Sequence, residues 1–257
     1  MKIRRKLADG QPVIGSWLDT ASPTVAELMA AAGFDFLTVD AEHSAVDLVG
    51  TQRMFRAMAA GNPACAPFVR VPGHQYAEIK RYVDAGALGV ICPLVNTPDQ
   101  AAELVRAVKY PPLGARGVGF CRDNRYGLSI EERIGTANDE TVVCVQIEHV
   151  DAVEWIDQIL AVPGLDAVFI GPYDLSTSLG VPAQFEHPDY LAAKHRILSA
   201  CRDHGLAAGV HVVQPRPDEV VTAFEEGYRL IAYSLDITML TNACTEGLAR
   251  IRERIRR

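Results

Sequence analysis

Two acidic residues at the ends of apolar stretches could together bind a metal ion. Glu148 follows the stretch 142–147, and Asp174 follows the stretch 166–173. Such stretches predict buried parallel strands, and carboxylates at the C-terminal ends of neighbouring strands lie close together. Two carboxylates suit octahedral Mg²⁺ or Mn²⁺ better than tetrahedral zinc. The remaining metal positions stay open, so a 2-oxo acid could bind there, and the metal would stabilise the enolate formed from it.

Other polar residues are predicted to point toward the same place. Alternate residues of a strand face opposite sides, and one row of each predicted strand is apolar and faces outward. The inward rows then contain Asp40, Arg70, Gln146 and Glu148, with His43 just beyond the second strand. We expect these side chains to converge on one mouth of the fold.

Each of these residues also has a structural explanation. Glu148 and Arg70 could form a buried ion pair, whereas Asp174 and His43 could each cap a helix. Burying so many ionisable groups near one end would be costly without a ligand or metal. Taken together, the residues therefore favour a binding site.

The lysines argue against chemistry through an imine. A Schiff-base enzyme needs a desolvated lysine on an inward strand position. All lysines of the chain are instead predicted to be terminal or helical: Lys2, Lys6, Lys80, Lys109 and Lys194.

The elements that must position these residues repeat as strand and helix. Eight such units in 257 residues predict one (β/α)8 barrel as a single domain over 1–257, with its site at the C-terminal ends of the strands. No Gly-x-Gly-x-x-Gly motif follows the first strand, so a dinucleotide-binding sheet has no local support. The predicted strands are 13–18, 35–40, 66–71, 88–93, 142–147, 166–171, 207–213 and 229–235. The predicted helices are 23–32, 47–60, 75–85, 98–109, 150–160, 188–204, 216–226 and 238–256.

Two segments depart from this alternation of strands and helices. The connection 110–141 is unusually long, and such connections are often functional or mobile. It starts on the lower face of the barrel, so it could pack outside the barrel or build a subunit interface. The last helix repeats apolar residues every three or four positions and ends in arginines.

Composition limits the partners and the location. The net charge is −7, from 25 basic and 32 acidic residues, which argues against nucleic acid and anionic membranes as partners. No signal-like or membrane-spanning apolar stretch is present, which predicts a cytoplasmic protein. The 6 cysteines are far apart, so a zinc site or a disulfide framework is disfavoured.

Several ordered motifs resemble the HpcH/HpaI family of metal-dependent pyruvate aldolases, and the resemblance covers residues 13 to about 240. The motifs are Gly15-Ser-Trp-Leu, Ser22-Pro, Ala31-Ala-Gly-Phe-Asp-Phe, Asp40-Ala-Glu-His43, Val69-Arg-Val-Pro72, Gly89-Val-Ile-Cys-Pro-Leu-Val-Asn96, Tyr110-Pro-Pro-Leu-Gly-x-Arg-Gly117, Gln146-Ile-Glu148 and Phe169-Ile-Gly-Pro-Tyr-Asp-Leu-Ser176.

The resemblance implies an activity and an assembly. Enzymes of this family reversibly cleave a 4-hydroxy-2-oxo acid to pyruvate, or an analogue such as hydroxypyruvate, and an aldehyde. They use a divalent metal, here Mg²⁺, Mn²⁺ or Co²⁺. They are homo-oligomers, usually hexamers built as trimers of dimers, in which the last helix is exchanged between subunits.

The resemblance also implies roles for individual residues. Glu148 and Asp174 would bind the metal, and Arg70 would stabilise the enolate oxygen. His43 would transfer a proton, paired with Asp84. Because Asp84 ends a helix on the opposite face of the barrel, we expect it to reach His43 only from a neighbouring subunit. The substrate would contact Trp17, Asp40, Gln146, Gly171, Pro172 and Tyr173, and the backbone amides after Gly171 would receive its carboxylate.

Two positions differ from the family pattern and affect the expected substrate. Tyr173 is bulkier than the small residue expected there, and the segment 120–126 in the long connection is also less typical. Three alternatives remain open at this stage. The same scaffold could decarboxylate a 2-oxo diacid, cleave a CoA thioester, or bind a metabolite without catalysis.

Overall fold

Eight parallel strands form a closed barrel. The computed structural model describes residues 2–256, and its strands pair with their sequence neighbours in the order β1-β2-β3-β4-β5-β6-β7-β8, with β8 returning to β1. This confirms the predicted (β/α)8 barrel. The strands are β1 (Val13–Leu18), β2 (Phe36–Asp40), β3 (Ala66–Arg70), β4 (Gly89–Cys92), β5 (Val142–Ile147), β6 (Ala167–Ile170), β7 (Ala207–Val212) and β8 (Leu230–Leu235).

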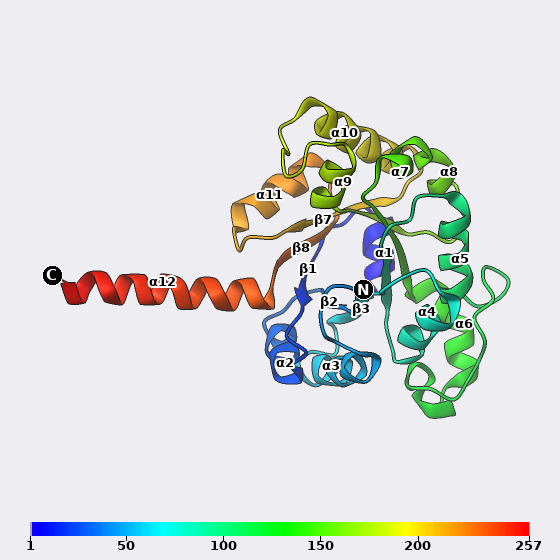
Figure 1. The fold of residues 1–257 in the computed structure, drawn as a ribbon. Helices are drawn as coiled ribbons and strands as arrows, with labels where there is room; N and C mark the ends of the chain where they lie inside the picture. Colours follow the sequence, from blue (N-terminus) through cyan, green and yellow to red (C-terminus); the bar gives the residue numbers. More distant parts are fainter. Residues whose placement is uncertain (1, 257) are drawn as a thin grey trace.

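Helices surround the barrel on its outside (Figure 1). The predicted helix 150–160 is divided in two at Trp155, and a short helix, α9, follows β6. The helices are α1 (Ile3–Ala8), α2 (Pro23–Ala31), α3 (Leu48–Gly61), α4 (Tyr76–Asp84), α5 (Pro98–Val108), the 3-10 helix η1 (Arg122–Gly127), α6 (Ile130–Glu140), α7 (Val150–Glu154), α8 (Ile156–Leu160), α9 (Pro172–Ser178), α10 (Pro188–Asp203), α11 (Pro217–Glu226) and α12 (Asp236–Arg256).

Two apolar cores hold the barrel together, one outside it and one inside it. The outer core lies between strands and helices and includes Val143, Val145 and Ile147. The inner core includes Cys144 and Phe169. The predicted alternation of inward and outward residues is therefore confirmed along β5.

The N-terminal helix α1 closes the lower end of the barrel, which the sequence did not indicate. Its buried residues Ile3 and Leu7 belong to the inner core rather than to the outer one. With the lower end covered by apolar side chains, the polar interior residues face the upper mouth.

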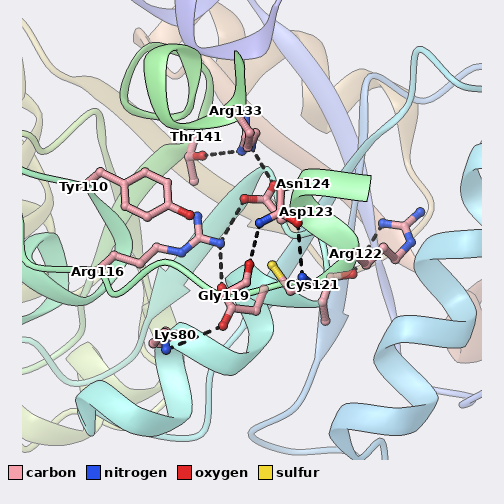
Figure 2. A network of polar contacts seen from close by, with 12 residues as sticks. Lys80, Tyr110, Arg116, Gly119, Cys121, Arg122, Asp123, Asn124, Arg133 and Thr141 are labelled. Carbon is pink, nitrogen blue, oxygen red and sulfur yellow. Dashed lines mark hydrogen bonds and ion pairs between the residues drawn. The ribbon is translucent and has the colours of Figure 1, made fainter. Parts of the chain in front are cut away.

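The long connection 110–141 is largely ordered into η1 and α6, and it carries a buried ionic network on the lower side of the barrel (Figure 2). Arg116 lies 4.7 Å from the centre of the Tyr110 ring, and its Nη2 donates to both Asp84 and Asp123. Arg133 donates to Asp123 at 2.7 Å, and also to Glu140 and Thr141. We name this set, with Lys2 and Lys80, the lower charge cluster.

The C-terminal helix α12 extends away from the barrel (Figure 1). It contacts the strands β1 and β8 near its start. The predicted amphipathic pattern is present, but its apolar residues are exposed within one chain: Ile237, Leu240, Leu248, Ile251 and Ile255. No helix within residues 2–256 is long and apolar enough to cross a membrane.

Candidate active site

A cavity of about 330 Å³ opens at the C-terminal ends of the strands. Its position is the one that enzymes with this fold use for catalysis. Most of the predicted site residues line it, together with several that were not predicted. The lining residues are Trp17, Asp19, Asp40, His43, Arg70, Gln146, Phe169, Ile170, Gly171, Pro172, Tyr173, Asp174, His211, Val213 and Leu235.

Arg70 is held rigidly at the wall of this cavity. Its Nε donates to Asp40 at 3.0 Å, its Nη2 donates to the second oxygen of Asp40, and Glu42 lies 3.2 Å away. Although burial raises the pKa of Asp40, hydrogen bonds and charge from Arg70 hold it below its ordinary value. The alternative of a buried Arg70–Glu148 ion pair is wrong, because Arg70 pairs with Asp40 and Glu42 instead. Asp40, predicted to bind substrate, lines the cavity but uses both oxygens on Arg70.

Trp17 forms the floor beneath the guanidinium group. The carbon of that group lies 4.5 Å from the centre of the Trp17 ring, a favourable cation–π distance. The ring also contacts Phe169 edge-on at 5.7 Å and His211 at 5.6 Å. Its Nε1 is buried and has no hydrogen-bond partner within residues 2–256.

Glu148 lies just beneath the cavity, with 3% of its surface exposed. One of its oxygens accepts a hydrogen bond from the Leu94 backbone at 2.7 Å, and the other accepts one from the Gln146 side chain. Leu94 has a left-handed backbone (φ 51°), which turns the loop after β4 toward this carboxylate. Burial raises the pKa of Glu148, and the charges of Asp174 and Glu42 raise it further.

Gly171 permits the close approach of β5 and β6 at this point. A Cβ atom there would lie 2.4 Å from Oε2 of Glu148, closer than any real contact. α9 then begins at Pro172 and carries Asp174 in its first turn, where it is exposed. The backbone amides of this turn have no acceptor inside the helix, as at any helix start. The predicted binding of a substrate carboxylate to them stays a prediction.

His43 and Tyr173 lie at the rim of the cavity. The His43 ring is largely exposed, 3.7 Å from Glu42, and neither it nor Asp174 caps a helix. Burial raises the pKa of Glu42 despite the positive charges of Arg70 and His43. Tyr173 is exposed and packs edge-on against Phe185 at 5.1 Å.

Asp19 and His211 were missed in the sequence. Asp19 follows β1, and burial, with the charges of Asp40 and Asp236, raises its pKa to about 6. His211 lies on the inward row of β7, two residues after Gly209, and burial lowers its pKa to about 4. The alternation of inward and outward residues along β7 would have predicted that His211 faces inward. Asp19 lies just past the end of β1, so the same rule does not reach it.

Two other charged residues lie away from the cavity. Asp84 ends α4 and pairs with Arg116 and Lys80 in the lower charge cluster, as expected of one subunit. Lys109 is fully buried and burial lowers its pKa, as an imine-forming lysine would require. However, its Nζ donates to the backbone of Asn138 and Thr141, at the start of β5 rather than at the mouth.

The residues near Glu148 fit a bound divalent cation. Oε1 of Gln146 is buried without a partner within residues 2–256, and Gly171 leaves space beside the Glu148 carboxylate. Both observations leave oxygen atoms available, and oxygen ligands suit hard cations. Within the described chain no group of three or more His, Cys, Asp or Glu residues could hold a metal, so a cation here would rely on two carboxylates.

Comparisons of the sequence and of the fold with known proteins point to one family. The model of the HpcH/HpaI aldolase/citrate lyase family matches residues 13–243. A hydroxypyruvate/pyruvate aldolase of Roseobacter denitrificans is 38% identical over 241 residues, covering 93% of this chain and 92% of the relative. A 4-hydroxy-2-oxovalerate aldolase of Novosphingobium aromaticivorans is 36% identical, with coverages of 95% and 92%.

A solved structure is similarly close. The crystal structure of an HpcH/HpaI aldolase/citrate lyase family protein from Burkholderia cenocepacia has a TM-score of 0.92 and 36% sequence identity to this chain. The match covers 97% of this chain and 98% of that one. The likeness therefore extends over the whole barrel.

Proposed function

The chain belongs to the HpcH/HpaI aldolase/citrate lyase family and is a lyase of the pyruvate aldolase kind, and we propose that it reversibly cleaves a 4-hydroxy-2-oxo acid. The products would be an aldehyde and pyruvate or hydroxypyruvate. The observation that carries this proposal is that Arg70, Gln146 and Asp174 line the same cavity. A positive group and oxygen ligands around one small cavity suit a 2-oxo acid.

Arg70 would stabilise the negative charge that develops on the keto oxygen. Asp40 and Glu42 fix its guanidinium group, so the donors need no rearrangement during the reaction. Burial lowers the pKa of Arg70, but Asp40 and Glu42 raise it above its ordinary value, so the group stays charged. We assign Asp40 a positioning role.

His43 would remove the proton of the C4 hydroxyl during cleavage and return it during synthesis. Its exposed ring at the rim can reach a substrate in the cavity. As the C3–C4 bond breaks, its electron pair would pass to the 2-oxo acid fragment, whose keto oxygen faces Arg70. The aldehyde would leave through the rim beside His43 and Tyr173.

A divalent cation, Mg²⁺, Mn²⁺ or Co²⁺, would bind Glu148 and Asp174 and act as a Lewis acid on the keto group. Gln146 would orient Glu148 through the hydrogen bond between their side chains. Gly171, Pro172 and Tyr173 would contact the substrate from the start of α9, and Trp17 would support it from below.

We also propose a homo-oligomer, a hexamer built as a trimer of dimers, located in the cytoplasm. The exposed apolar residues of α12 support an exchange of this helix between subunits, because such residues usually lie in an interface. A neighbouring subunit could also bring Asp84 to His43, as the family resemblance implies. Size measurement in solution together with the activity of Asp84→Asn tests both points.

The proposed activity is testable by product release. The purified enzyme would be stripped with a chelator, loaded with Mg²⁺, Mn²⁺ or Co²⁺, and given a panel of 4-hydroxy-2-oxo acids as separate enantiomers. We expect metal-dependent release of pyruvate or hydroxypyruvate with one equivalent of aldehyde. Parallel measurement of CO₂ from oxaloacetate and of CoA-thioester cleavage covers the alternative reactions. Release of CO₂ without any aldol cleavage would contradict the proposal.

A further inference from the structure

The wall of the cavity formed by β7 and β1 carries hydrogen-bond acceptors that lack donors. Asp19 lines this wall, and its Oδ1 is buried with no partner within residues 2–256. His211 lines the same cavity, and its ring lies 5.6 Å from that of Trp17 on β1. A buried acceptor without a donor costs about 1–3 kcal/mol, so a ligand that brings O–H or N–H groups would stabilise this wall.

The His211 ring is held in one orientation and one tautomer. Its Nε2 lies 3.0 Å from the backbone oxygen of Ser234, and the ring packs beside that of Trp17 at 5.6 Å with a tilt of 37°. Since a carbonyl can only accept, Nε2 carries the proton and Nδ1 presents a lone pair. Burial lowers the pKa of His211 to about 4, which keeps the ring neutral near pH 7. Within the described residues the ring makes no second hydrogen bond.

An irregularity in β8 provides this orientation. The pairing of β1 with β8 shifts register after Gly15, and Ser234 has a left-handed backbone (φ 53°). Its carbonyl oxygen accepts from Ser16 Oγ at 3.0 Å as well as from His211. β-bulges commonly redirect groups near active sites, and this one fixes the free nitrogen of His211.

The wall faces the part of the site that would hold the 2-oxo group. In the closed strand order, β7 lies four strands from β3 and β1 lies four strands from β5. In the proposed function, Arg70 on β3 would face the keto oxygen, and Gln146 on β5 would orient Glu148 beside it. The third carbon of the substrate would then point toward β7 and β1.

We propose that His211 is a specificity residue, which accepts a hydrogen bond from a hydroxyl on the third carbon and selects hydroxypyruvate over pyruvate as the nucleophilic partner. Asp19 adds a second acceptor to the same wall. The inference rests on the proposed aldolase function. A methyl group in this position would leave the acceptors unpaired, and sites built to bind a hydroxyl discriminate strongly against analogues that lack it.

The test compares the two nucleophiles with one aldehyde. We would measure kcat/KM for hydroxypyruvate and pyruvate with glycolaldehyde, using the full-length, Mg²⁺-loaded enzyme. We expect the wild type to prefer hydroxypyruvate by about 10-fold or more. His211→Leu should lower that ratio by about 10-fold through the hydroxypyruvate value, with the pyruvate value unchanged or higher. His211→Gln keeps an acceptor and should retain part of the preference.

His195→Leu serves as the matched control, because His195 is exposed on α10. Its ratio should equal that of the wild type. If His211→Leu fails to fold, the Kd values of hydroxypyruvate and pyruvate for the wild type and His211→Gln are measured by quenching of tryptophan fluorescence, since Trp17 adjoins His211.

The outcomes separate the two levels of the proposal. An unchanged ratio in a folded His211→Leu variant, or a wild type that prefers pyruvate, overturns the role of His211. In the binding experiment, equal Kd values for the two acids in the wild type do the same. A wild type without aldol activity toward either acid instead refutes the proposed function.

Discussion

Charged side chains gather at both ends of this barrel, and the two groups differ in their balance of acids and bases. In the lower charge cluster, acidic and basic side chains pair with each other (Figure 2). At the upper mouth, acids outnumber bases. The lower acids are Asp84, Asp123 and Glu140, facing Lys2, Lys80, Arg116 and Arg133; the upper acids are Asp19, Asp40, Glu42, Glu148 and Asp174, facing Arg70 and His43.

The two groups of acids also differ in the direction in which their pKa values are shifted. Burial raises the pKa of Glu140, but bonds from Lys2 and Thr136 and the charge of Arg133 bring it below its ordinary value. Burial instead leaves the pKa values of Glu42, Glu148 and Asp19 raised. A self-neutralised cluster supports the fold, whereas an excess of acids favours binding of a cation. Within one subunit, the difference distinguishes a structural network from a site; Asp84 is the one member of the network that is also proposed to act, at His43 of a neighbouring subunit.

Breaking the lower charge cluster should have the largest effect, and on stability alone. Arg133→Ala would remove the guanidinium group that Asp123 and Glu140 share, leaving Asp123 with Arg116 and Glu140 with Lys2. Losing one member of a buried ion pair typically costs up to about 3–5 kcal/mol. Urea unfolding measures this loss. The kcat of the folded fraction should match the wild type, and Arg106→Ala, at an exposed pair with Glu103, should change stability by less than about 1 kcal/mol. A large loss of kcat in Arg133→Ala would show that the two ends are not separate.

Removing the positive group at the mouth should act mainly on turnover. Arg70→Ala and Glu148→Ala should each lower kcat by at least about 100-fold, since both remove electrostatic stabilisation of the developing charge. Arg70→Lys keeps the charge and should recover part of the rate, with circular dichroism checking the fold. Near-normal turnover in either alanine variant would refute the role assigned to that residue.

Closing the space beside Glu148 should give a smaller loss. The added methyl group in Gly171→Ala would push on the Glu148 carboxylate, and a displacement of this size can cost up to about 100-fold in rate. We expect weaker Mg²⁺ binding in calorimetry along with the lower rate. Gly135→Ala on α6 is the control, because a Cβ atom there meets nothing within 4 Å. Equal Mg²⁺ affinity in both variants would remove Gly171 from the site.

The smallest expected effect is a pH dependence of stability at the mouth. Because the folded pKa of Asp19, about 6, lies above its ordinary value of 3.8, the folded state holds its proton more tightly than the unfolded state does. Its contribution to stability is therefore full below about pH 4 and is lost as the pH rises through 6. Solvent at the mouth limits the change to about 1 kcal/mol. Asp19→Asn should remove it, as measured by urea unfolding at pH 4.5 and 7.5; an identical pH profile in the variant would contradict the assignment.

The barrel and most of the mouth were predictable from local patterns. Alternation along β2, β3 and β5 correctly placed Asp40, Arg70 and Gln146 inside, because a strand has only two faces. The pairing of Arg70 with Asp40 and Glu42 was not predictable, since it depends on the register of β2 against β3. The ion-pair alternative with Glu148 was wrong for this reason.

Features that depend on contacts between distant parts of the chain could not be predicted from the sequence. α1 fills the lower end of the barrel interior. This interior exists only after all eight strands have closed, so local sequence patterns do not reveal where α1 packs. The environment of Asp19 depends on β8 and the start of α12, because Asp236 accepts from the Asp19 backbone. The order within 110–141 comes from contacts with distant α4, as between Arg116 and Asp84.

The exposed apolar stripe of α12 has a consequence for how stability should be measured. A helix of 21 residues that touches its own barrel only near its start gains little from intramolecular packing. If its apolar residues are covered by another copy, that part of the folding free energy follows mass action and grows with protein concentration. Tm would then rise on concentrating the protein and fall on dilution. Comparisons between variants would need equal subunit concentrations.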